Sequence, residues 1–500
     1  MRITNQMITN NMMNGINKNK NNLSLLDQQY SSGKKIQRPS EDPIIAVRAL
    51  KLRTNLAELN QYYEKNIPDA KSWMDVTEGA MTNINDILTL INTACVQGAS
   101  DPPLSVEDRN SIVKNLEQYK EQIYQEGNAN YAGRYVFTGY KTDTSLIFGE
   151  ASSNLEYTIT ENFTGKDIES ISKVTGTYSV DDYDLSNDYS QSPELQTSYR
   201  IRLSYDNVDA VQADGVTPVN ISGSLKVLDK DGNPVTPLPA ITTVSVNDPN
   251  AYKPTAGINY IPETGELILS QDAYDDLRTA SSISVDYPKT DFKEGELRPE
   301  HYFDCTVHES GAPATEIKTY KKQDQDIQYE INFNQKLTVN TQGSDALQQD
   351  IGRDIDEILQ AVQDVKATEA KISEVEKMLK DPNYASETEQ LNKLKSQLET
   401  ELTLKNSIMQ KKFGNGITDS ANAQNTLNVA IADLGSRYVR LELTESRLSD
   451  QQVDFTDLMS TNEDADMVDT YIKLSSAEVI YNASLSAASK VVQNTLLDFL

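Results

Sequence analysis

The chain has 500 residues, a formal net charge of −29 at pH 7 and two cysteines, Cys95 and Cys305. Such an acidic surface repels nucleic acid, and two cysteines exclude a disulfide scaffold, which leaves two free thiols as the expectation. Hydrophobic residues make up 37% of the chain and the mean hydropathy is −0.56, which predicts narrow cores like those of elongated helical bundles. The N-terminus lacks the apolar core of a cleaved signal peptide, and no run approaches the ~18 apolar residues of a membrane helix.

Residues 3–35 predict a helix that becomes ordered when it packs on a partner. Its apolar side chains recur alternately every four and three residues, with a polar break at Asn19, and they are Met12, Ile16, Leu23, Leu26 and Tyr30. The flanking residues are mostly Asn and Lys, and Asn is a poor helix former. Ser32-Gly33 predicts the end of this helix, and Ser40 followed by Pro43 predicts the start of the next one.

The longest apolar stripe in the chain runs from Ile45 to Ile91 at the same spacing, with polar positions at Asn66 and Thr77. Pro68 interrupts this stripe and predicts a kink or a division of the helix. A further helix is expected over residues 105–128. Between about 131 and 340 the chain is rich in Thr, Ser, Tyr, Asp, Gly and Pro, and it contains short alternating runs that predict mostly antiparallel β-structure.

Helices are expected again after Gly343, over residues 351–379, from about 386 to 402 and over 418–458, with a break at 461–464. The stripe of the last helix passes through Met467, Tyr471, Leu474, Glu478, Tyr481, Leu485, Ala488, Val492, Thr495 and Phe499. It matches the stripe of the first helix in length and in its mix of apolar and polar positions. We therefore expect the two termini to pack together.

The predicted fold class is α+β, an elongated helical rod formed by the N- and C-terminal segments with a central, mostly antiparallel β-domain. Five segments follow from this interpretation: 1–42 and 463–500 as the two helices of a terminal coiled-coil unit, 43–135 and 343–462 as the halves of the rod, and 136–342 as the outer β-rich domain. The second half of the rod includes a helical hairpin. Whether the helical pair at 345–412 belongs to the core or is an insertion stays open.

Short motifs occur in order along both ends of the chain. They are Ser31-Ser32-Gly33-Lys34-Lys35-Ile36, Arg38-Pro39-Ser40-Glu41-Asp42-Pro43, Thr77-Glu78-Gly79-Ala80-Met81, Gly133-Arg134-Tyr135-Val136-Phe137-Thr138-Gly139, Leu434-Gly435-Ser436-Arg437 and Leu496-Leu497-Asp498-Phe499-Leu500. With them the chain resembles the bacterial flagellin family, and within it the hook-associated proteins of the hook–filament junction. The motif residues that carry the resemblance include Gly33, Arg38, Pro39, Asp42, Pro43, Glu78, Gly79 and Arg437.

The resemblance implies a structural protein that is exported unfolded through the flagellar type III export apparatus, without a cleaved signal peptide. It implies an extracellular place at the hook–filament junction, as a ring-like layer between the first hook-associated protein and flagellin. It also implies an export chaperone that holds the C-terminal region, terminal helices that fold on assembly, and neither membrane insertion nor a nucleic-acid partner.

Few residues suggest catalysis, so we expect no enzyme, no catalytic residue, no metal site and no cofactor. His308-Glu309-Ser310-Gly311-Ala312 begins like a zinc-protease helix but lacks the second histidine, so a solvated loop is expected there. Asp229, Asp231 and Asn233 alternate as in a calcium loop, but Pro234 stands where such a loop needs glycine, so a hairpin turn is favoured. Neither cysteine has a signature that would activate its thiol.

A stripe with four-and-three spacing is usually part of an intramolecular core, but the polar residues inside both terminal stripes favour packing between subunits. The candidate subunit-interface residues are Met12, Ile16, Leu23, Leu26, Tyr30, Tyr471, Leu474, Tyr481, Leu485, Val492, Leu496 and Phe499. Arg38, Arg437 and Arg440 form either buried contacts between helices or solvated pairs. The first functional hypothesis is an axial protein that joins the hook-associated zone to the flagellin filament. The alternatives are a divergent flagellin and a secreted adhesin or binding module.

Overall fold

The computed structural model describes residues 5–100, 106–181, 183–184, 187–210, 219, 221–309 and 316–497. Within these ranges the side chains at 5, 106–107, 222 and 491–497 are outside the description. The chain folds as two compact units. The first unit comprises Met1–Ala70, Tyr329–Leu337 and Val439–Leu500, and the second comprises Lys71–Gln328 and Thr338–Tyr438.

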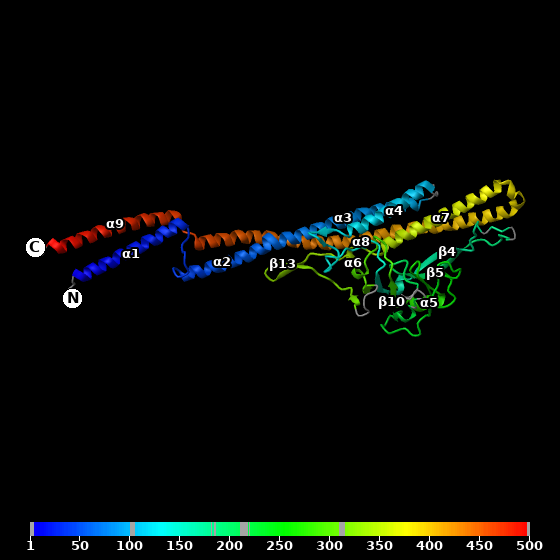
Figure 1. The fold of residues 1–500 in the computed structure, drawn as a ribbon, viewed down its shortest axis with the longest axis horizontal. Coiled ribbons are helices and arrows are strands. Elements are labelled where there is room, and N and C mark those ends of the chain that lie inside the picture. The colour runs from blue at the N-terminus through cyan, green and yellow to red at the C-terminus, as the bar shows by residue number, and fades with distance from the viewer. Residues whose placement is uncertain are drawn as a thin grey trace. The chain divides into compact units, whose positions relative to one another are not determined.

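The predicted α+β class is confirmed, with helices from both ends of the chain and a central, mostly antiparallel β-region (Figure 1). The α-helices are α1 (Asn5–Ser32), α2 (Pro43–Gln61), α3 (Ile67–Gly98), α4 (Val106–Glu126), α5 (Gln271–Leu277), α6 (Gly343–Ala346), α7 (Asp350–Lys380), α8 (Thr388–Glu463) and α9 (Met467–Leu497). Short 3-10 segments are η2 (Gly165–Asp167), η3 (Ile221–Gly223), η4 (Pro299–His301) and η5 (Pro382–Glu387). The segments expected at 105–128 and 351–379 correspond to α4 and α7.

The stripe from Ile45 to Ile91 is the less exposed face of α2 and α3, as its spacing predicts. Near Pro68 the helical stretch is divided, as the sequence predicts, because a π-helix, η1 (Tyr62–Asn66), separates α2 from α3. The Ile67 amide donates to the Tyr62 carbonyl five residues back. Proline at position 68 has no amide hydrogen to donate, and the wider π turn shortly before it is one way in which a helix adjusts to such a residue.

Within the described residues, the strands form two five-stranded sheets and two small hairpins. They are β1 (Asn130–Tyr131), β2 (Arg134–Tyr135), β3 (Leu155–Phe163), β4 (Glu169–Thr175), β5 (Glu194–Arg202), β6 (Lys226–Leu228), β7 (Ile241–Thr243), β8 (Ile258–Ile261), β9 (Glu266–Leu269), β10 (Ser282–Lys289), β11 (Asp304–Glu309), β12 (Lys318–Tyr320), β13 (Gln328–Asn332) and β14 (Gln335–Thr338). The sheet orders are β12-β11-β3-β10-β6 and β4-β5-β9-β8-β7, and β7 with β8 is a parallel pair. We call residues 155–320, which hold both larger sheets, the β-domain.

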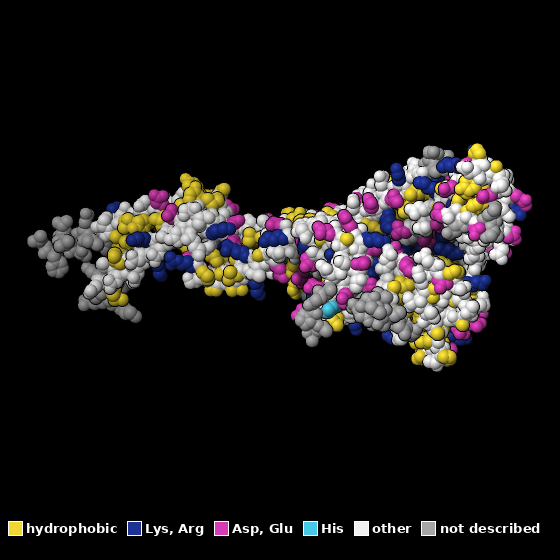
Figure 2. All heavy atoms as spheres, turned by 45° about the vertical axis from the view of Figure 1, so that its right-hand side comes forward, with side chains coloured by type: hydrophobic (Ala, Val, Ile, Leu, Met, Phe, Trp, Pro, Cys, Tyr) yellow, Lys and Arg dark blue, Asp and Glu magenta, His cyan; other side chains and the backbone are white. Residues whose placement is uncertain are grey.

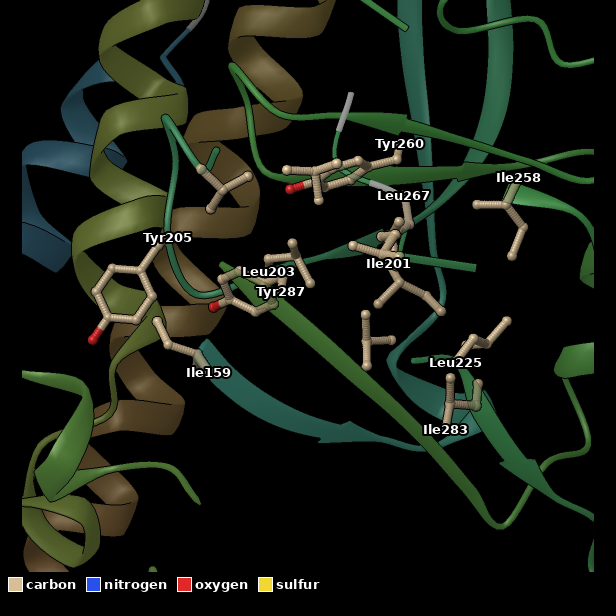
Figure 3. Packing of buried hydrophobic residues seen from close by; sticks show 14 of the residues in the cluster. Ile159, Ile201, Leu203, Tyr205, Leu225, Ile258, Tyr260, Leu267, Ile283 and Tyr287 are labelled. Atoms are coloured by element: carbon tan, nitrogen blue, oxygen red, sulfur yellow. The ribbon is translucent and has the colours of Figure 1, made fainter. Parts of the chain in front are cut away.

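The core of the β-domain lies between its two sheets (Figure 3). Ile159 of β3 and Ile283 of β10 come from one sheet, and Ile201 of β5 and Leu267 of β9 come from the other. Along β3 and β10 the buried side chains alternate with more exposed residues, which is the pattern of strands that bury one face, whereas every residue of β9 is buried. After β6 the predicted turn is confirmed, because the Asp229 carboxylate accepts the Asp231 and Asn233 amides at 2.9 and 2.8 Å.

Helices α7 and α8 form the expected helical hairpin, and the long connection between β4 and β5 packs on its end. Tyr178 and Tyr189 from this connection join a cluster with Val375 of α7 and with Leu391 and Leu394 of α8. Lys371 donates to the Tyr178 carbonyl at 2.9 Å. The hairpin end and the β4–β5 connection therefore bury one another.

One sequence expectation about α8 is wrong, because a single helix of 76 residues replaces two separate ones. Neither Gly414 nor Gly416 breaks it. Gly416 is needed for close packing instead, because a Cβ atom there would lie 2.8 Å from Ile358 Cδ1 of α7 and 2.9 Å from Cys95 Sγ of α3. Gly435 of the same helix has open space around its position.

This contrast predicts opposite effects of two alanine substitutions in α8. Gly435→Ala should raise the free energy of unfolding by ~0.5–1 kcal/mol, because alanine favours the helix and nothing blocks its methyl group. Gly416→Ala should lower that free energy by a net ~1–2 kcal/mol, because overpacking costs more than the helix gains. Urea denaturation followed by circular dichroism measures both. Equal shifts of the same sign would contradict the packing assigned to Gly416.

Candidate assembly site

The terminal helices α1 and α9 pack antiparallel along one another (Figure 1). The Asn19 side-chain amide donates to the Ser484 hydroxyl at 2.8 Å, and the rings of Tyr30 and Tyr471 lie 5.8 Å apart. Residue numbers therefore rise along one helix as they fall along the other. The polar break at Asn19 has a partner in the facing helix, so it specifies the register of the pair.

On α1 the predicted stripe is the contact face. Leu26 is buried, and Met12, Ile16 and Leu23 are half-buried, whereas Tyr30 is exposed at the edge of its contact with Tyr471. Further apolar residues of α1, Met7, Ile8, Met13 and Leu25, are exposed. Leu25 directly precedes the buried Leu26, so neighbouring residues of this helix serve different faces.

On α9 the contact face differs from the predicted stripe. The less exposed side chains on this face are Thr470, Leu474, Ala477, Tyr481, Ser484 and Ala488. Leu474, Tyr481 and Ala488 belong to the predicted stripe, but Met467, Tyr471, Glu478 and Leu485 are exposed. Small and hydroxyl side chains line the contact because they let the two helices approach closely. Of the other predicted interface residues, Phe499 and the side chains of Val492 and Leu496 lie outside the described part of the chain.

A second face of α9 carries aliphatic side chains that no residue of the described chain covers. Val468, Ile472 and Val479 are 71%, 59% and 68% exposed, and they recur at helical spacing. Figure 2 shows such hydrophobic side chains at the surface of the terminal helices. Exposed aliphatic residues that gather on one face indicate an interaction surface, because burying each one gains about 1.5–3 kcal/mol.

Two short loops, residues 33–42 and 464–466, are joined into what we call the clasp. Gly33 ends α1 with a φ of +70°, a backbone conformation that favours glycine. The Lys35 amide donates to the Glu463 carbonyl at 2.7 Å, and the Ala465 amide donates to the Gly33 carbonyl at 2.8 Å. Lys34 and Asp464 form the antiparallel bridge between them. The clasp thus connects the end of α1 to the start of α9.

Glu463, the last residue of α8, lies directly beside the clasp and carries its main charged contacts. Its side chain is 5% exposed and accepts two hydrogen bonds from the Arg53 guanidinium, at 2.7 and 2.5 Å. These hydrogen bonds, with the nearby Lys34 ammonium, lower the pKa of the Glu463 carboxyl. Lys34 itself lies 2.5 Å from Asp464, and this hydrogen bond raises the pKa of the lysine. No sequence pattern identifies Arg53 and Glu463 as partners, because 410 residues separate them.

The motif residues of the first loop prepare the start of α2. Asp42, rather than the expected Ser40, is the N-cap, and its carboxylate accepts the amides of Ile44 and Ile45. Pro43 occupies the first helical position, where its missing amide hydrogen costs nothing. Arg38 and Pro39 are exposed. An aspartate followed by proline is therefore a helix-start signal here.

The remaining motif residues belong to the second unit. Glu78 and Gly79 are exposed on α3, and Gly79 has no atom within 4 Å of the place a Cβ would occupy. Arg437 of α8 donates to the carbonyls of Thr338 and Asn340 at 3.2 and 2.8 Å and pairs with Asp433. Arg437 therefore holds the chain that follows β14, and its contact is not one between helices.

Both cysteines are buried, and both histidines are half-buried. Burial raises the pKa of the Cys95 and Cys305 thiols to about 12 and lowers the pKa of His301 to about 4. His308 lies in β11, with Nδ1 3.5 Å from the Glu156 carboxylate, so the expectation of a solvated loop is wrong at this residue. Over the described ranges no group of three or more His, Cys, Asp or Glu side chains is arranged to hold a metal ion. No helix there combines the length and apolar character needed to span a membrane.

Comparison with known proteins finds sequence similarity in the N-terminal part of the chain. Residues 3–142 match the bacterial flagellin N-terminal helical region. Over 146 residues the chain is 30% identical to flagellar hook-associated protein 3 of Salmonella typhimurium, a match that covers 29% of this chain and 45% of that protein. A flagellin of Clostridium tyrobutyricum is 30% identical over 128 residues, which are 26% of this chain and 33% of that one.

These matches span less than half the length of either relative. Among solved structures, the flagellar junction protein of Legionella pneumophila aligns with a TM-score of 0.29 and 13% identity, covering 84% of this chain and 100% of that one. The part of the chain that contains α1, α2, α3 and α4 is therefore similar in sequence to flagellin N-terminal regions.

The clasp predicts that Glu463→Gln loosens the pairing of α1 with α9. Loss of the charge-assisted hydrogen bonds to Arg53 should cost about 1 kcal/mol, because Arg53 itself is solvent-exposed. Amide hydrogens of residues 33–35 and 463–466 should then exchange about fivefold faster, as measured by mass spectrometry. Since the pKa of Glu463 is lowered, this stabilisation is present above its ordinary value near 4.5 and is lost as the pH falls below it.

The matched control is Asp457→Asn, which removes an exposed carboxylate from the same end of α8. It should leave exchange in the clasp unchanged. Equal effects of the two substitutions would show that the net charge of the helix, and not the pairing of Glu463, governs the clasp.

Proposed function

We propose that this protein is a structural component of the bacterial flagellar axis that joins the hook-associated zone to the flagellin filament. The observation that carries the proposal is the match of residues 3–142 to the flagellin N-terminal region, together with a terminal helix pair whose outer faces are aliphatic and exposed. A protein that works by assembly needs such faces, because they supply the apolar area that is buried between subunits.

The junction role is favoured over that of a filament subunit. The match to hook-associated protein 3 is longer than the match to the Clostridium flagellin, at equal identity. Asp42-Pro43, a feature of the junction-type motif, is an intact N-cap at the start of α2. A divergent flagellin is the second candidate, supported by the flagellin match. In either role the protein is structural and has no catalytic task.

Assembly would use residues that the free chain leaves exposed. Of the predicted interface residues, Tyr30, Tyr471 and Leu485 meet this condition, and Val468, Ile472 and Val479 of α9 are exposed as well. Leu26, Leu474 and Tyr481 are occupied by the pairing of α1 with α9, so they would contact another subunit only after that pair opens. Burial of the exposed faces offsets the entropy lost when the subunits become ordered.

The implied partners follow from this role. They are the first hook-associated protein on one side and flagellin on the other, with self-association into a ring-like layer. An export chaperone and the type III export apparatus would act before assembly, and the working place would be extracellular. The acidic net charge of −29 supports this order, with export before assembly, because like charges keep unassembled chains apart at low concentration.

The test is salting-out polymerisation of the purified chain onto short hook or filament seeds, viewed by electron microscopy. The junction role predicts a short terminal addition that afterwards accepts flagellin. Long filaments formed by this chain alone would instead establish the flagellin role. A chain that adds to no seed, and stays monomeric with both terminal helices folded, would overturn the assembly proposal and favour an adhesin or binding module.

A double substitution tests which face assembles. Ile472→Ser with Val479→Ser removes two aliphatic side chains that would each gain about 1.5–3 kcal/mol on burial, so the protein concentration needed for addition to seeds should rise at least about tenfold. The monomer should keep its circular dichroism spectrum. Lys473→Ser, also exposed on α9, should leave the required concentration unchanged. Unimpaired addition by the double variant would rule out this face as the contact.

A further inference from the structure

A dense network of buried charges lies where β5 of the β-domain packs on α7. The side chains of Arg200 and Arg202 are 5% and 9% exposed. Arg200 lies 2.5 Å from Glu266, 2.7 Å from Glu169 and 2.6 Å from Glu357. Both arginines extend from one strand, so a single element of the β-domain presents two fixed cations to the helix.

Glu357 of α7 connects the arginines of β5 with the charged residues of the helical hairpin. It pairs with Arg200 at 2.6 Å and with Arg202 at 3.0 Å, and it also pairs with Lys412 of α8. Burial opposes its ionisation, but these three cations keep the pKa of Glu357 below its usual range. Glu357 is therefore the charged anchor that attaches β5 to the helical hairpin.

Asp354, on the same side of α7, has a different environment. It pairs with Arg202 at 2.7 Å, a cation that it shares with Glu357 and Asp350. Burial, together with the nearby Asp419 and Asp350 carboxylates, raises the pKa of Asp354 to about 7 although Arg202 acts in the opposite direction. Carboxylates outnumber cations at this place, so one carboxylate is favoured to hold a proton.

The charged and titratable groups around Asp354 come from every element packed there. They are Asp350, Arg353 and Glu357 of α7, Arg200 and Arg202 of β5, Asp167 of η2, Glu169 and Lys173 of β4, Glu266 of β9, Lys412 and Asp419 of α8, Cys95 of α3 and Tyr124 of α4.

We propose that this network is a proton-controlled latch, in which protonated Asp354 lets β5 dock closely on α7 and loss of that proton loosens the dock. The proton relieves repulsion between Asp354 and the facing Asp350 and Asp419 carboxylates, and it leaves Arg202 to pair with Glu357. The tyrosine cluster at the end of the hairpin is apolar in its main contacts and stays in place. The latch thus changes the contact locally and does not release the whole β-domain.

The direction of the pH dependence follows from the raised pKa of Asp354. The docked state holds the proton more tightly than a solvated aspartate does, so its advantage is complete below the ordinary value near 3.8. That advantage declines as the pH rises and is fully lost above about 7. Between pH 5 and pH 9 the docking equilibrium should weaken by roughly ten- to hundredfold.

Hydrogen exchange of the full chain at pH 5 to 9, corrected for the intrinsic effect of pH, tests the latch. Protection of residues 194–202 and 350–357 should fall about ten- to hundredfold between pH 5 and pH 9, with most of the fall below pH 7. Asp354→Asn, which mimics the protonated side chain, should keep these segments protected at pH 9. Glu374→Gln, an exposed change on the same helix, should retain the pH dependence of the unmodified chain.

A second buried carboxyl titrates in the same range and has to be separated from the latch. Burial raises the pKa of Glu161 to about 7, and this residue accepts hydrogen bonds from Tyr287 and the Ser204 amide inside the β-domain. Its ionisation would affect β3 and β10 and would persist in Asp354→Asn. A loss of protection that is uniform over the β-domain and unchanged by Asp354→Asn would therefore overturn the latch.

Asp419→Asn gives an independent measurement if Asp354→Asn fails to fold. Removal of a facing carboxylate should move the midpoint of the protection change to lower pH, because less repulsion opposes the ionisation of Asp354. Unchanged circular dichroism at pH 5 would show that the variant is folded. Protection that stays constant from pH 5 to 9 in the unmodified chain, or an unchanged midpoint in Asp419→Asn, would contradict the proposal.

Discussion

The buried face of α8 is the constraint on which the described structure depends. Its apolar side chains recur at helical spacing over most of the helix, and they are Leu391, Leu394, Leu398, Met409, Phe413, Leu427, Leu434, Leu441 and Leu448. Different parts of the chain pack on successive stretches of it. The β4–β5 connection meets Leu391 and Leu394, α3 and α7 approach closely at Gly416, and Arg437 holds the segment after β14. A single long helix can serve all of these partners because it repeats the same geometry along its whole length.

Polar groups inside this framework specify geometry more than they stabilise it. Asn92 of α3 donates to the Ile417 carbonyl and the Ser420 hydroxyl of α8, and Asn19 donates to Ser484 in the terminal pair. A sliding of either pair by one residue would leave these amides unsatisfied, which costs more than a well-made hydrogen bond gains. Buried ion pairs act in the same way, because Glu463 and Glu357 each pair with an arginine from an element that is far away in the sequence.

Periodicity identified the elements well where a single face of each helix is buried. The Ile45–Ile91 stripe, the α7 helix and the α1 stripe all appear where the spacing places them. The prediction was partly wrong for α9, because Thr470, Ala477 and Ser484 join residues of the predicted stripe in the contact face while other stripe residues are exposed. Sequence spacing alone did not mark these small side chains, but close approach of two helices selects them. In α8 two helical segments were expected, but one continuous helix forms, and Gly416 lies inside it as a packing residue.

From the sequence by itself follow the α+β class, the helical character of both ends, the turn at Asp229 and the motifs that match flagellin N-terminal regions, because each depends on neighbouring residues. Only the tertiary structure decided which carboxylates and cations become partners. Arg53 with Glu463 and Arg200 with Glu357 lie 410 and 157 positions apart, and no local pattern marks one charged residue for another at that distance. Burial decided their protonation as well, since desolvation depends on the atoms that surround a carboxyl group in the folded chain.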